Sequence, residues 1–484
     1  METEETKKIR RVEQILIRRG SKKYKKLYKF LDTLCFYAKD HYNMMNFEMR
    51  QSFLENDGDA SKIPSYYDKA SEFCKLGDTQ ERIGSVSTQD ITKTFMESWK
   101  SFKKITLEFE KDPEKYCKKR GIDPELLTKT TEKGIPLGKP KMPKYLDKDK
   151  GRYIFVARGR SFKPYSTDKY ICSVKILNNL YKKITGEEKF VINSYRKRIT
   201  TEQDGGTAKL NQVRIVPKAD AYVIEMIFEI TLEKSVIYED KYRTKETRKE
   251  EAKTEKISDR TAAIKLGVND FLTLVNNFGE SPLILSGSAF KPIIDAYIER
   301  KAYLTSIATT VNNVHTTRQI QRLSNKVTRQ TKYIANMYSK YIVEWCKKNQ
   351  VTDVVLMKTK GMKQGLTSKY AGLIPTAICE NQLLYKLEEA GISVKDVNGS
   401  NTKNTSFLDL EPTEKKYENK NRIKDGIFMS NDGIKINSSV NTTFQAMRKR
   451  YENAFTKENI SSVKIEPLIY TVIDNKLKLT NNTK

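Results

Sequence analysis

Hydrophobic residues in the first quarter of the chain recur at the spacing of an α-helix. From Ser21 onward they fall at Leu27, Leu31, Leu34, Ala38, Tyr42, Met45 and Met49. Residues three or four positions apart share one face of a helix, so this face is expected to be buried. Trp99, Phe102, Ile105 and Phe109 repeat the spacing. The pattern predicts a mainly helical region that extends to about Leu127.

The pattern changes at residues 138–145, where Gly138, Pro140 and Pro143 argue against a helix. Strand signals follow at residues 153–156 and 170–174. In a third run, apolar residues alternate with Glu225 and Glu229, as expected for a strand with one buried face. Its apolar members are Tyr222, Ile224, Met226, Phe228 and Ile230. These short strands indicate a small, barrel-like β domain.

Residues 239–256 are almost wholly charged or polar, and we place a domain boundary there. Beyond it, short apolar runs alternate with helical patterns. We expect three antiparallel strands, two helices, a strand, a helix, a strand and a last helix. Their expected ranges are 263–268, 271–275, 282–285, from 293, about 311–347, 354–357, 379–390, 392–397 and 442–453. This order is typical of an RNase H-like α/β domain, so the fold class is α+β and multidomain.

The formal net charge of the 484 residues is +29. Such self-repulsion is expected to be neutralised by a polyanion, and nucleic acid is the natural one. An anionic membrane is the alternative, but the Lys and Arg residues are spread along the chain rather than gathered on one amphipathic helix. The chain has neither an apolar run of about 18 residues nor an N-terminal signal-like segment. We expect a cytoplasmic, nucleoid-associated protein.

Cysteine and histidine offer little chemistry. The six cysteines are widely scattered, and no pair has the spacing of a zinc finger. Only His41 and His315 could serve in acid–base catalysis. We therefore expect reduced thiols and no zinc site.

Residues 262–269 (Ala-Ala-Ile-Lys-Leu-Gly-Val-Asn) form an apolar run that ends in a turn. The run resembles the first strand of the RuvC-type, RNase H-like nucleases of the transposon-encoded TnpB/OrfB family, which carry an aspartate where this chain has Lys265. Residues 398–409 resemble that family's second acidic segment, with Asn398 and Gly399 in place of the acidic pair. Residues 436–444 resemble the third, where Ser439 replaces an aspartate, and the more usual second acidic position is Met357.

Further similarities to the same subgroup lie at residues 139–152, 286–291 and 358–364, so the resemblance covers nearly the whole chain. Asn336 and Thr376 depart from it, since relatives often carry histidine there. In such nucleases the carboxylates hold two divalent ions that stabilise the attacking and leaving oxygens. Asp270, Asp396 and Asp432 lie near the altered positions, and Asp396 is the best candidate to replace a lost ligand.

The resemblance implies a nuclease-dead TnpB-like repressor. Such a protein is RNA-guided, binds double-stranded DNA next to a short motif, needs a guide RNA and has no catalytic metal. We expect one protein per guide RNA. The implied domains are a β-barrel wedge domain (1–20 and 139–240), an inserted helical recognition domain (21–138), a charged linker (241–257) and a catalytically degenerate RuvC domain (258–484).

Three groups of residues are predicted to contact nucleic acid. They belong to the first helix, to the Pro-rich segment and to the edge of the altered site. The residues are Lys22, Lys23, Lys25, Lys26, Lys29, Lys139, Lys141, Lys144, Tyr145, Lys358, Lys360, Lys363 and Lys403. Two alternatives remain open: an active RNA-guided endonuclease with a rearranged metal site, and a general RNA-binding accessory protein.

Overall fold

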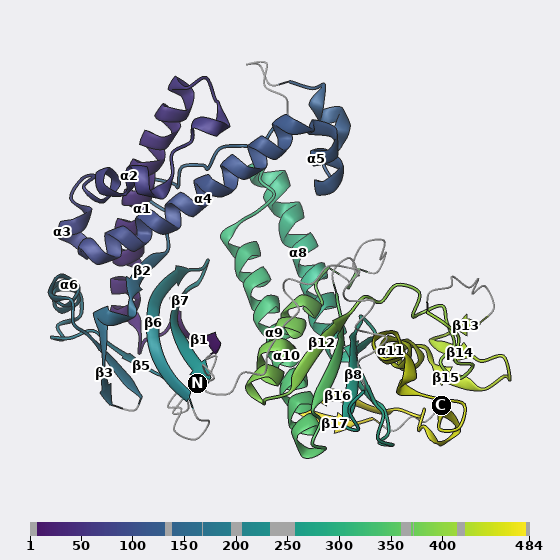
Figure 1. Cartoon of the computed structure of the whole chain (residues 1–484). Coiled ribbons are helices and arrows are strands. Elements are labelled where there is room, and N and C mark those ends of the chain that lie inside the picture. The colour runs from purple at the N-terminus through teal and green to yellow at the C-terminus, as the bar shows by residue number, and fades with distance from the viewer. Residues whose placement is uncertain are drawn as a thin grey trace, which may run out of the picture. The chain divides into compact units, whose positions relative to one another are not determined.

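The computed structural model describes residues 7–130, 138–166, 168–194, 206–232, 257–359, 369–370, 372–413 and 422–480. The chain divides into two compact units, Met1–Ser235 and Val236–Lys484 (Figure 1). The boundary falls beside the charged segment predicted as a linker, most of which lies outside the described residues.

The first unit contains two antiparallel sheets. The larger one has the order β1-β7-β6-β2, and the smaller one has the order β3-β4-β5. The alternation predicted for residues 222–230 is confirmed, because Tyr222, Ile224 and Met226 are buried in the core. The strands are β1 (Lys7–Arg18), β2 (Phe155–Arg158), β3 (Phe162–Ser166), β4 (Lys169–Cys172), β5 (Val191–Asn193), β6 (Gly206–Pro217) and β7 (Ala221–Leu232).

Six α-helices lie in the described part of this unit. The longest, α1, buries the stripe that the spacing predicts, from Leu31 through Ala38 to Met49. Helices and sheets share one hydrophobic core, in which Trp99 and Phe30 are among the largest buried side chains. The helices are α1 (Lys25–Glu55), α2 (Tyr66–Cys74), α3 (Thr79–Ile83), α4 (Ser85–Lys111), α5 (Pro113–Arg120) and α6 (Lys175–Thr185). The division of this unit into a wedge and an inserted helical domain stays a prediction.

The second unit is built on a seven-stranded sheet of order β12-β11-β8-β9-β10-β16-β17. β8, β9 and β10 are antiparallel neighbours, whereas β11 runs parallel to β8 and β12 parallel to β11. The strands are β8 (Thr261–Leu266), β9 (Asp270–Asn276), β10 (Leu283–Ser286), β11 (Asp353–Met357), β12 (Ser393–Val397), β16 (Leu468–Ile473) and β17 (Lys476–Leu479).

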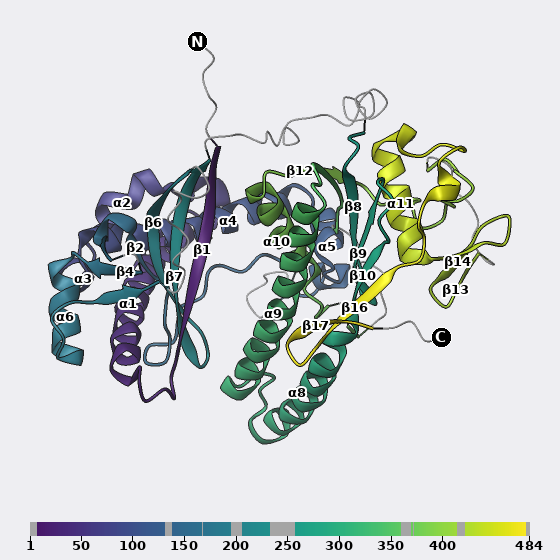
Figure 2. The same cartoon turned by 90° about the horizontal axis from the view of Figure 1, so that it is seen from below.

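Helices cover both faces of this sheet (Figure 2). Ile264 and Leu266 of β8 pack with α9 and α10, and α8 lies on the same face. Ala263 packs on the opposite face, against Val440 and Phe444 of α11. The helices are α8 (Lys291–Asn312), α9 (Arg318–Lys348), α10 (Thr376–Glu389) and α11 (Ser438–Arg450). The predicted order of strands and helices is therefore present.

Several boundaries differ from the prediction. Because α1 begins at Lys25, Lys22 and Lys23 precede the helix instead of lying on it. The sequence patterns also did not predict β1, β3, β5, β6, β16, β17 or a small sheet of three short strands. That sheet consists of β13 (Ile423–Lys424), β14 (Ile427–Met429) and β15 (Lys435–Asn437). Strands of two or three residues have no measurable period, so hydrophobic alternation cannot reveal them.

A half-buried carboxylate connects the first helix to two other segments of its unit. Asp32 of α1 accepts two hydrogen bonds of 2.9 Å from the Arg152 guanidinium and one of 2.6 Å from the Tyr222 hydroxyl. Burial raises the pKa of the Asp32 carboxyl, but these hydrogen bonds and the charge of Arg152 outweigh it and hold the pKa below its usual value. The ionised form therefore stabilises the fold.

We predict that Asp32→Asn lowers the free energy of unfolding of the first unit by about 1–2 kcal/mol at pH 7. A carboxylate whose pKa is lowered by folding contributes stability above its unfolded pKa and loses it as the pH falls through the folded value. The difference between the two proteins should therefore shrink below about pH 4. Urea unfolding followed by Trp99 fluorescence, in a Trp345→Phe background, measures it. The matched control is Asp149→Asn, and an equal loss in the control would contradict the assignment.

Candidate functional site

The pleat of β8 determines where the side chain of Lys265 lies. Ile264 and Leu266 face the core beneath α9 and α10, so Ala263 and Lys265 face α11. Lys265 pairs with Thr273 of β9, and Leu356 of β11 pairs with the neighbouring Ile264. The side chain is thus placed at the centre of the sheet, on the face covered by a single helix.

The first turn of α11 brings a second altered position to Lys265. The helix is capped by Asn437, whose side-chain oxygen accepts hydrogen bonds from the backbone N–H groups of Ser439 (2.8 Å) and Val440 (3.1 Å). The ammonium of Lys265 donates a hydrogen bond of 3.0 Å to the Ser439 hydroxyl. Two positions 174 residues apart in sequence, each predicted to have lost an aspartate, are therefore in direct contact.

The surroundings of Lys265 alter its acidity. Burial lowers the pKa of its ammonium group from 10.5 to about 8. The charge of Asp270 opposes this shift, and the charge of Lys403 adds to it. At neutral pH the side chain is still mainly protonated, so the site carries a positive charge.

The second acidic position of the resembled family is also packed differently here. A Cβ atom at Gly399 would lie 2.6 Å from Sδ and 3.2 Å from Cγ of Met357. The Thr402 hydroxyl donates a hydrogen bond of 2.8 Å to the Gly399 carbonyl oxygen. The Asn398 side chain accepts one of 3.0 Å from the backbone N–H of Ser400. Met357 therefore occupies the space that a side chain at position 399 would need.

The acidic residues predicted as replacement ligands are not gathered around Lys265 in the described part of the chain. Asp396, the best replacement candidate, forms an ion pair with Lys358. Asp270 stays close enough to affect Lys265, but it lies one strand away on β9. In the described ranges, no group of three or more His, Cys, Asp or Glu residues is placed to hold a metal ion. Lysine, serine and methionine are poor ligands for Mg²⁺, which prefers carboxylate oxygens, so the residues present do not fit a two-ion centre.

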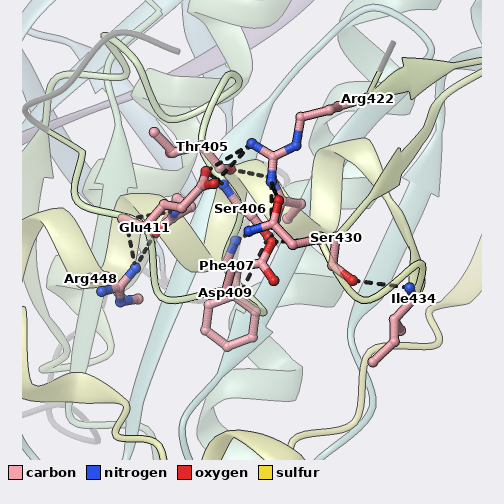
Figure 3. Close-up of polar contacts among 12 residues, drawn as sticks. Thr405, Ser406, Phe407, Asp409, Glu411, Arg422, Ser430, Ile434 and Arg448 are labelled. Carbon is pink, nitrogen blue, oxygen red and sulfur yellow. Dashed lines mark hydrogen bonds and ion pairs between the residues drawn. The ribbon is translucent and has the colours of Figure 1, made fainter. Parts of the chain in front are cut away.

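Ion pairs hold the loop after β12 in place (Figure 3). The Arg422 guanidinium donates hydrogen bonds to both carboxylate oxygens of Glu411, at 2.9 and 3.1 Å, and to Asp409 at 3.1 Å. Arg448 of α11 donates to the carbonyl oxygens of Leu410 and Glu411, each at 3.0 Å. Because this loop also carries Lys403, the network fixes one wall of the site.

The predicted nucleic-acid contacts fall into separate places. Among the predicted contact residues of the first unit, Lys139 is half-buried. The exposed ones are Lys22, Lys23, Lys25, Lys26, Lys29, Lys141 and Lys144. Lys26 donates a hydrogen bond to the carbonyl oxygen of Thr185. Lys358 and Lys403 are exposed in the second unit, and Lys360 and Lys363 lie outside the described residues. Contacts of these residues with nucleic acid stay a prediction.

The Pro-rich segment is fixed to the far end of α1. Asn46 and Arg50 donate hydrogen bonds to the Pro143 carbonyl oxygen, at 3.1 and 2.8 Å, and Tyr42 donates to that of Lys144. The Arg50 guanidinium also lies 5.0 Å from the centre of the half-exposed Tyr145 ring. At a rise of 1.5 Å per residue, these contacts lie about 30 Å along α1 from Lys26.

The sequence analysis missed a basic face on α9. Its members lie on the side opposite the buried Ile320, Val327 and Ile334, and from Arg318 to Lys332 they are spaced three or four residues apart. They are Arg318, Arg322, Lys326, Arg329, Lys332 and Lys340. All are exposed except the half-buried Arg329. The sequence does indicate this basic face, because no acidic residue occurs from Arg318 to Val343.

Asn336 and Thr376, the two departures at histidine positions, differ in their contacts: Asn336 is hydrogen-bonded, whereas the buried Thr376 hydroxyl has no hydrogen-bond partner in the described structure. Asn336 accepts hydrogen bonds from Lys386 through its side-chain oxygen (2.9 Å) and its carbonyl oxygen (3.2 Å). Thr376 is buried at the start of α10.

All six cysteines are buried and free of disulfide bonds, as expected for reduced thiols. No helix in the described part of the chain is long and apolar enough to cross a membrane.

Residues 239–363 match the family model OrfB_IS605, described as a probable transposase. No curated protein matches the chain. Two solved structures are similar over 88% of this chain, each with 14% sequence identity. One is a Cas12f1–sgRNA–target DNA complex, with a TM-score of 0.47 over 83% of that chain. The other is a CRISPR-Cas12f ternary complex, with a TM-score of 0.32 over 82% of that chain. The family match supports a relationship to the TnpB/OrfB proteins and covers the strand that contains Lys265.

We predict that Lys265→Met stabilises the second unit by about 1–2 kcal/mol at pH 7, because it removes a partly desolvated charge at the loss of one hydrogen bond. A lysine whose pKa falls on folding loses its proton first in the folded state. Wild-type stability therefore rises between about pH 8 and pH 10.5, and the advantage of methionine shrinks across that window. Urea unfolding followed by Trp345 fluorescence, in a Trp99→Phe background, tests this. An advantage that does not change with pH would contradict it.

We predict that Arg422→Met destabilises the second unit by about 2–4 kcal/mol, because it leaves the largely buried carboxylates of Asp409 and Glu411 without their partner. The same unfolding experiment measures the loss. Lys435→Met, which removes an exposed cation from the neighbouring β15, is the control and should change stability by less than about 0.5 kcal/mol. Similar losses in the two variants would exclude a special role for the network.

Proposed function

We propose that the protein is an RNA-guided, sequence-specific DNA-binding protein without nuclease activity, and that it acts as a transcriptional repressor. The contact between Lys265 and Ser439 carries the proposal. In a nuclease of the resembled family, these two positions would supply carboxylates to a shared pair of metal ions. Here they bond to each other, and one of them is a cation.

Physical chemistry argues against metal-dependent cleavage at this place. An ammonium group about 4 Å from a divalent ion repels it by several kcal/mol, even at an effective dielectric constant near 20. A side chain at position 399 would also require the Met357 side chain to move, because its Cβ would lie 2.6 Å from the Met357 Sδ. Asp396, the expected replacement ligand, forms an ion pair with Lys358. It precedes Val397 in β12 and therefore lies on the sheet face opposite to Lys265. Loss of cleavage thus rests on changes at three positions that act together.

The remaining features suit binding. In RNA-guided recognition, base pairing supplies the sequence specificity and the protein grips the backbone of the heteroduplex. The exchange of a DNA duplex for an RNA–DNA duplex is nearly balanced, so contacts with the backbone decide how long the complex lasts. The net charge of +29 and the basic face of α9 are suited to such contacts. A bound complex that does not cut would remain on its target and block RNA polymerase.

Sequencing the RNA that co-purifies with the tagged protein from its host tests whether the protein binds a guide RNA. One abundant RNA, with a structured body and a short 3′ extension that matches a chromosomal site, is the expected result. A broad mixture of transcripts, with no retention of DNA, would instead favour a general RNA-binding accessory protein.

We predict that the complex of protein and co-purified RNA leaves a matched DNA duplex uncut in the presence of Mg²⁺ or Mn²⁺. The measurement is a denaturing gel that resolves both DNA strands. A specific cut that disappears in Asp396→Asn would support the competing reading of an active endonuclease with a rearranged metal site. A cut that persists in Asp396→Asn would point to another site or to a contaminating nuclease.

We predict that replacing Arg318, Arg322 and Lys326 with glutamine weakens nucleic-acid binding to a similar extent for every sequence. Each lost phosphate contact lowers the slope of log affinity against log salt concentration by about 0.7–0.9, so the slope should fall by up to about 3. The matched control replaces the exposed Lys435, Lys457 and Lys464 of the same unit with glutamine. If the two triple variants have equal slopes, the basic face of α9 is not a contact surface.

A further inference from the structure

The altered metal site contains an excess of hydrogen-bond donors. Lys265 has three N–H groups, and its one hydrogen bond in the described chain is to Ser439. Ser439 accepts that bond with its hydroxyl oxygen, and its own hydroxyl proton has no acceptor among the described residues. The exposed Lys403 adds a second positive charge that Lys265 experiences. Unused donors beside two positive charges favour an anionic ligand.

We propose that Lys265, Ser439 and Lys403 form a binding site for one phosphodiester group of a nucleic-acid backbone. This inference rests on the proposed function and names a task for the site that lost its metal ligands. In a nuclease of the resembled family this site holds metal ions beside a phosphate. Here the side chains would bind the phosphate directly. The free N–H groups of Lys265 and the hydroxyl of Ser439 would donate to its non-bridging oxygens.

The position of Ser439 adds to this preference. It lies in the first turn of α11, a helix of 13 residues, where the positive end of the helix dipole favours an anion. Asn437 already accepts the backbone N–H groups of Ser439 and Val440, so the Ser439 hydroxyl is the donor that remains. The dipole therefore supports the charge of Lys265, and the side chains supply the hydrogen bonds.

Lysine is also a costly residue at this place. Burial disfavours its charge, and Ser439 is a neutral partner that cannot compensate for the loss of water. The groups that face Lys265 are Asp270 from β9, Lys403 from the loop after β12 and Ser439 from α11. A bound phosphate would add to the single negative charge of Asp270, and would favour the protonated lysine.

Because phosphate binding would favour the protonated form of Lys265, the affinity for nucleic acid should depend on pH. If phosphate binds the protonated lysine, binding takes up a proton above about pH 8, where the free protein has released it. Affinity should then fall as the pH rises from 8 to 9.5. A lysine that merely fills space beside Ser439 would produce no such dependence.

The test measures the affinity of the full-length protein for its co-purified RNA, and that of the assembled complex for a matched DNA duplex. Both are measured at several salt concentrations from pH 7 to 9.5. Lys265→Gln removes the titrating charge, Lys265→Arg keeps a permanent charge, and Lys457→Gln removes an exposed charge elsewhere in the unit. The arm that responds to Lys265→Gln identifies whether the phosphate belongs to RNA or to DNA.

We expect Lys265→Gln to weaken binding about tenfold in one arm and to lower the salt slope there by about 1. Its pH dependence should disappear between pH 8 and 9.5, whereas Lys265→Arg should bind almost as tightly as wild type, without pH dependence. Lys457→Gln should match wild type, and circular dichroism of each variant checks its folding. If Lys265→Gln keeps the wild-type affinity, slope and pH profile in both arms, the phosphate site is excluded.

The two proposals fail in different ways. If the wild-type complex binds no matched DNA, the proposed RNA-guided DNA binding is excluded. The RNA affinities of the Lys265 variants then still show whether Lys265 binds a phosphate. If matched DNA binds but no Lys265 variant alters either arm, the function stands and the phosphate site falls.

Discussion

The site depends on the packing of α11 against the central strands of the second unit. Val440 and Phe444 are buried with Ala263, Val275 and Val355, so the first turn of the helix has to lie over the middle of β8. Strand alternation then directs residue 265 toward that turn. The same geometry would bring two aspartates together around metal ions, and here it brings a lysine to a serine. The fold therefore fixes the meeting point, and the side chains alone change its chemistry.

Much of this arrangement is predictable from the sequence. The apolar run at residues 262–268 predicts a buried strand, and the patterns after it predict the order of strands and helices along the chain. That residues 265 and 439 belong to one site is implied by the resemblance to the TnpB/OrfB nucleases, because hydrophobic periodicity does not show which segments meet. The space filled by Met357 beside Gly399 is not predictable, because it depends on tertiary distances between chain segments 42 residues apart. The ion pair of Asp396 with Lys358 is hidden for the same reason.

Two misses have different causes. The three short strands β13–β15 have two or three residues each, so hydrophobic periodicity cannot reveal them. The basic face of α9, by contrast, is visible in the sequence, because lysines and arginines recur there at helical spacing and no acidic residue lies between them. It is overlooked when lysines are judged by their local surroundings and not by the helix face that they share.

The central claim is that the protein occupies a guide-matched chromosomal site without cutting it. Cross-linking the protein to DNA in its host, and mapping both its positions and DNA ends genome-wide, tests this most directly. The account predicts one strong occupied site that matches the 3′ end of the bound RNA and carries no excess of DNA ends. An excess of breaks at that site, or occupancy that does not follow the RNA sequence, would contradict it.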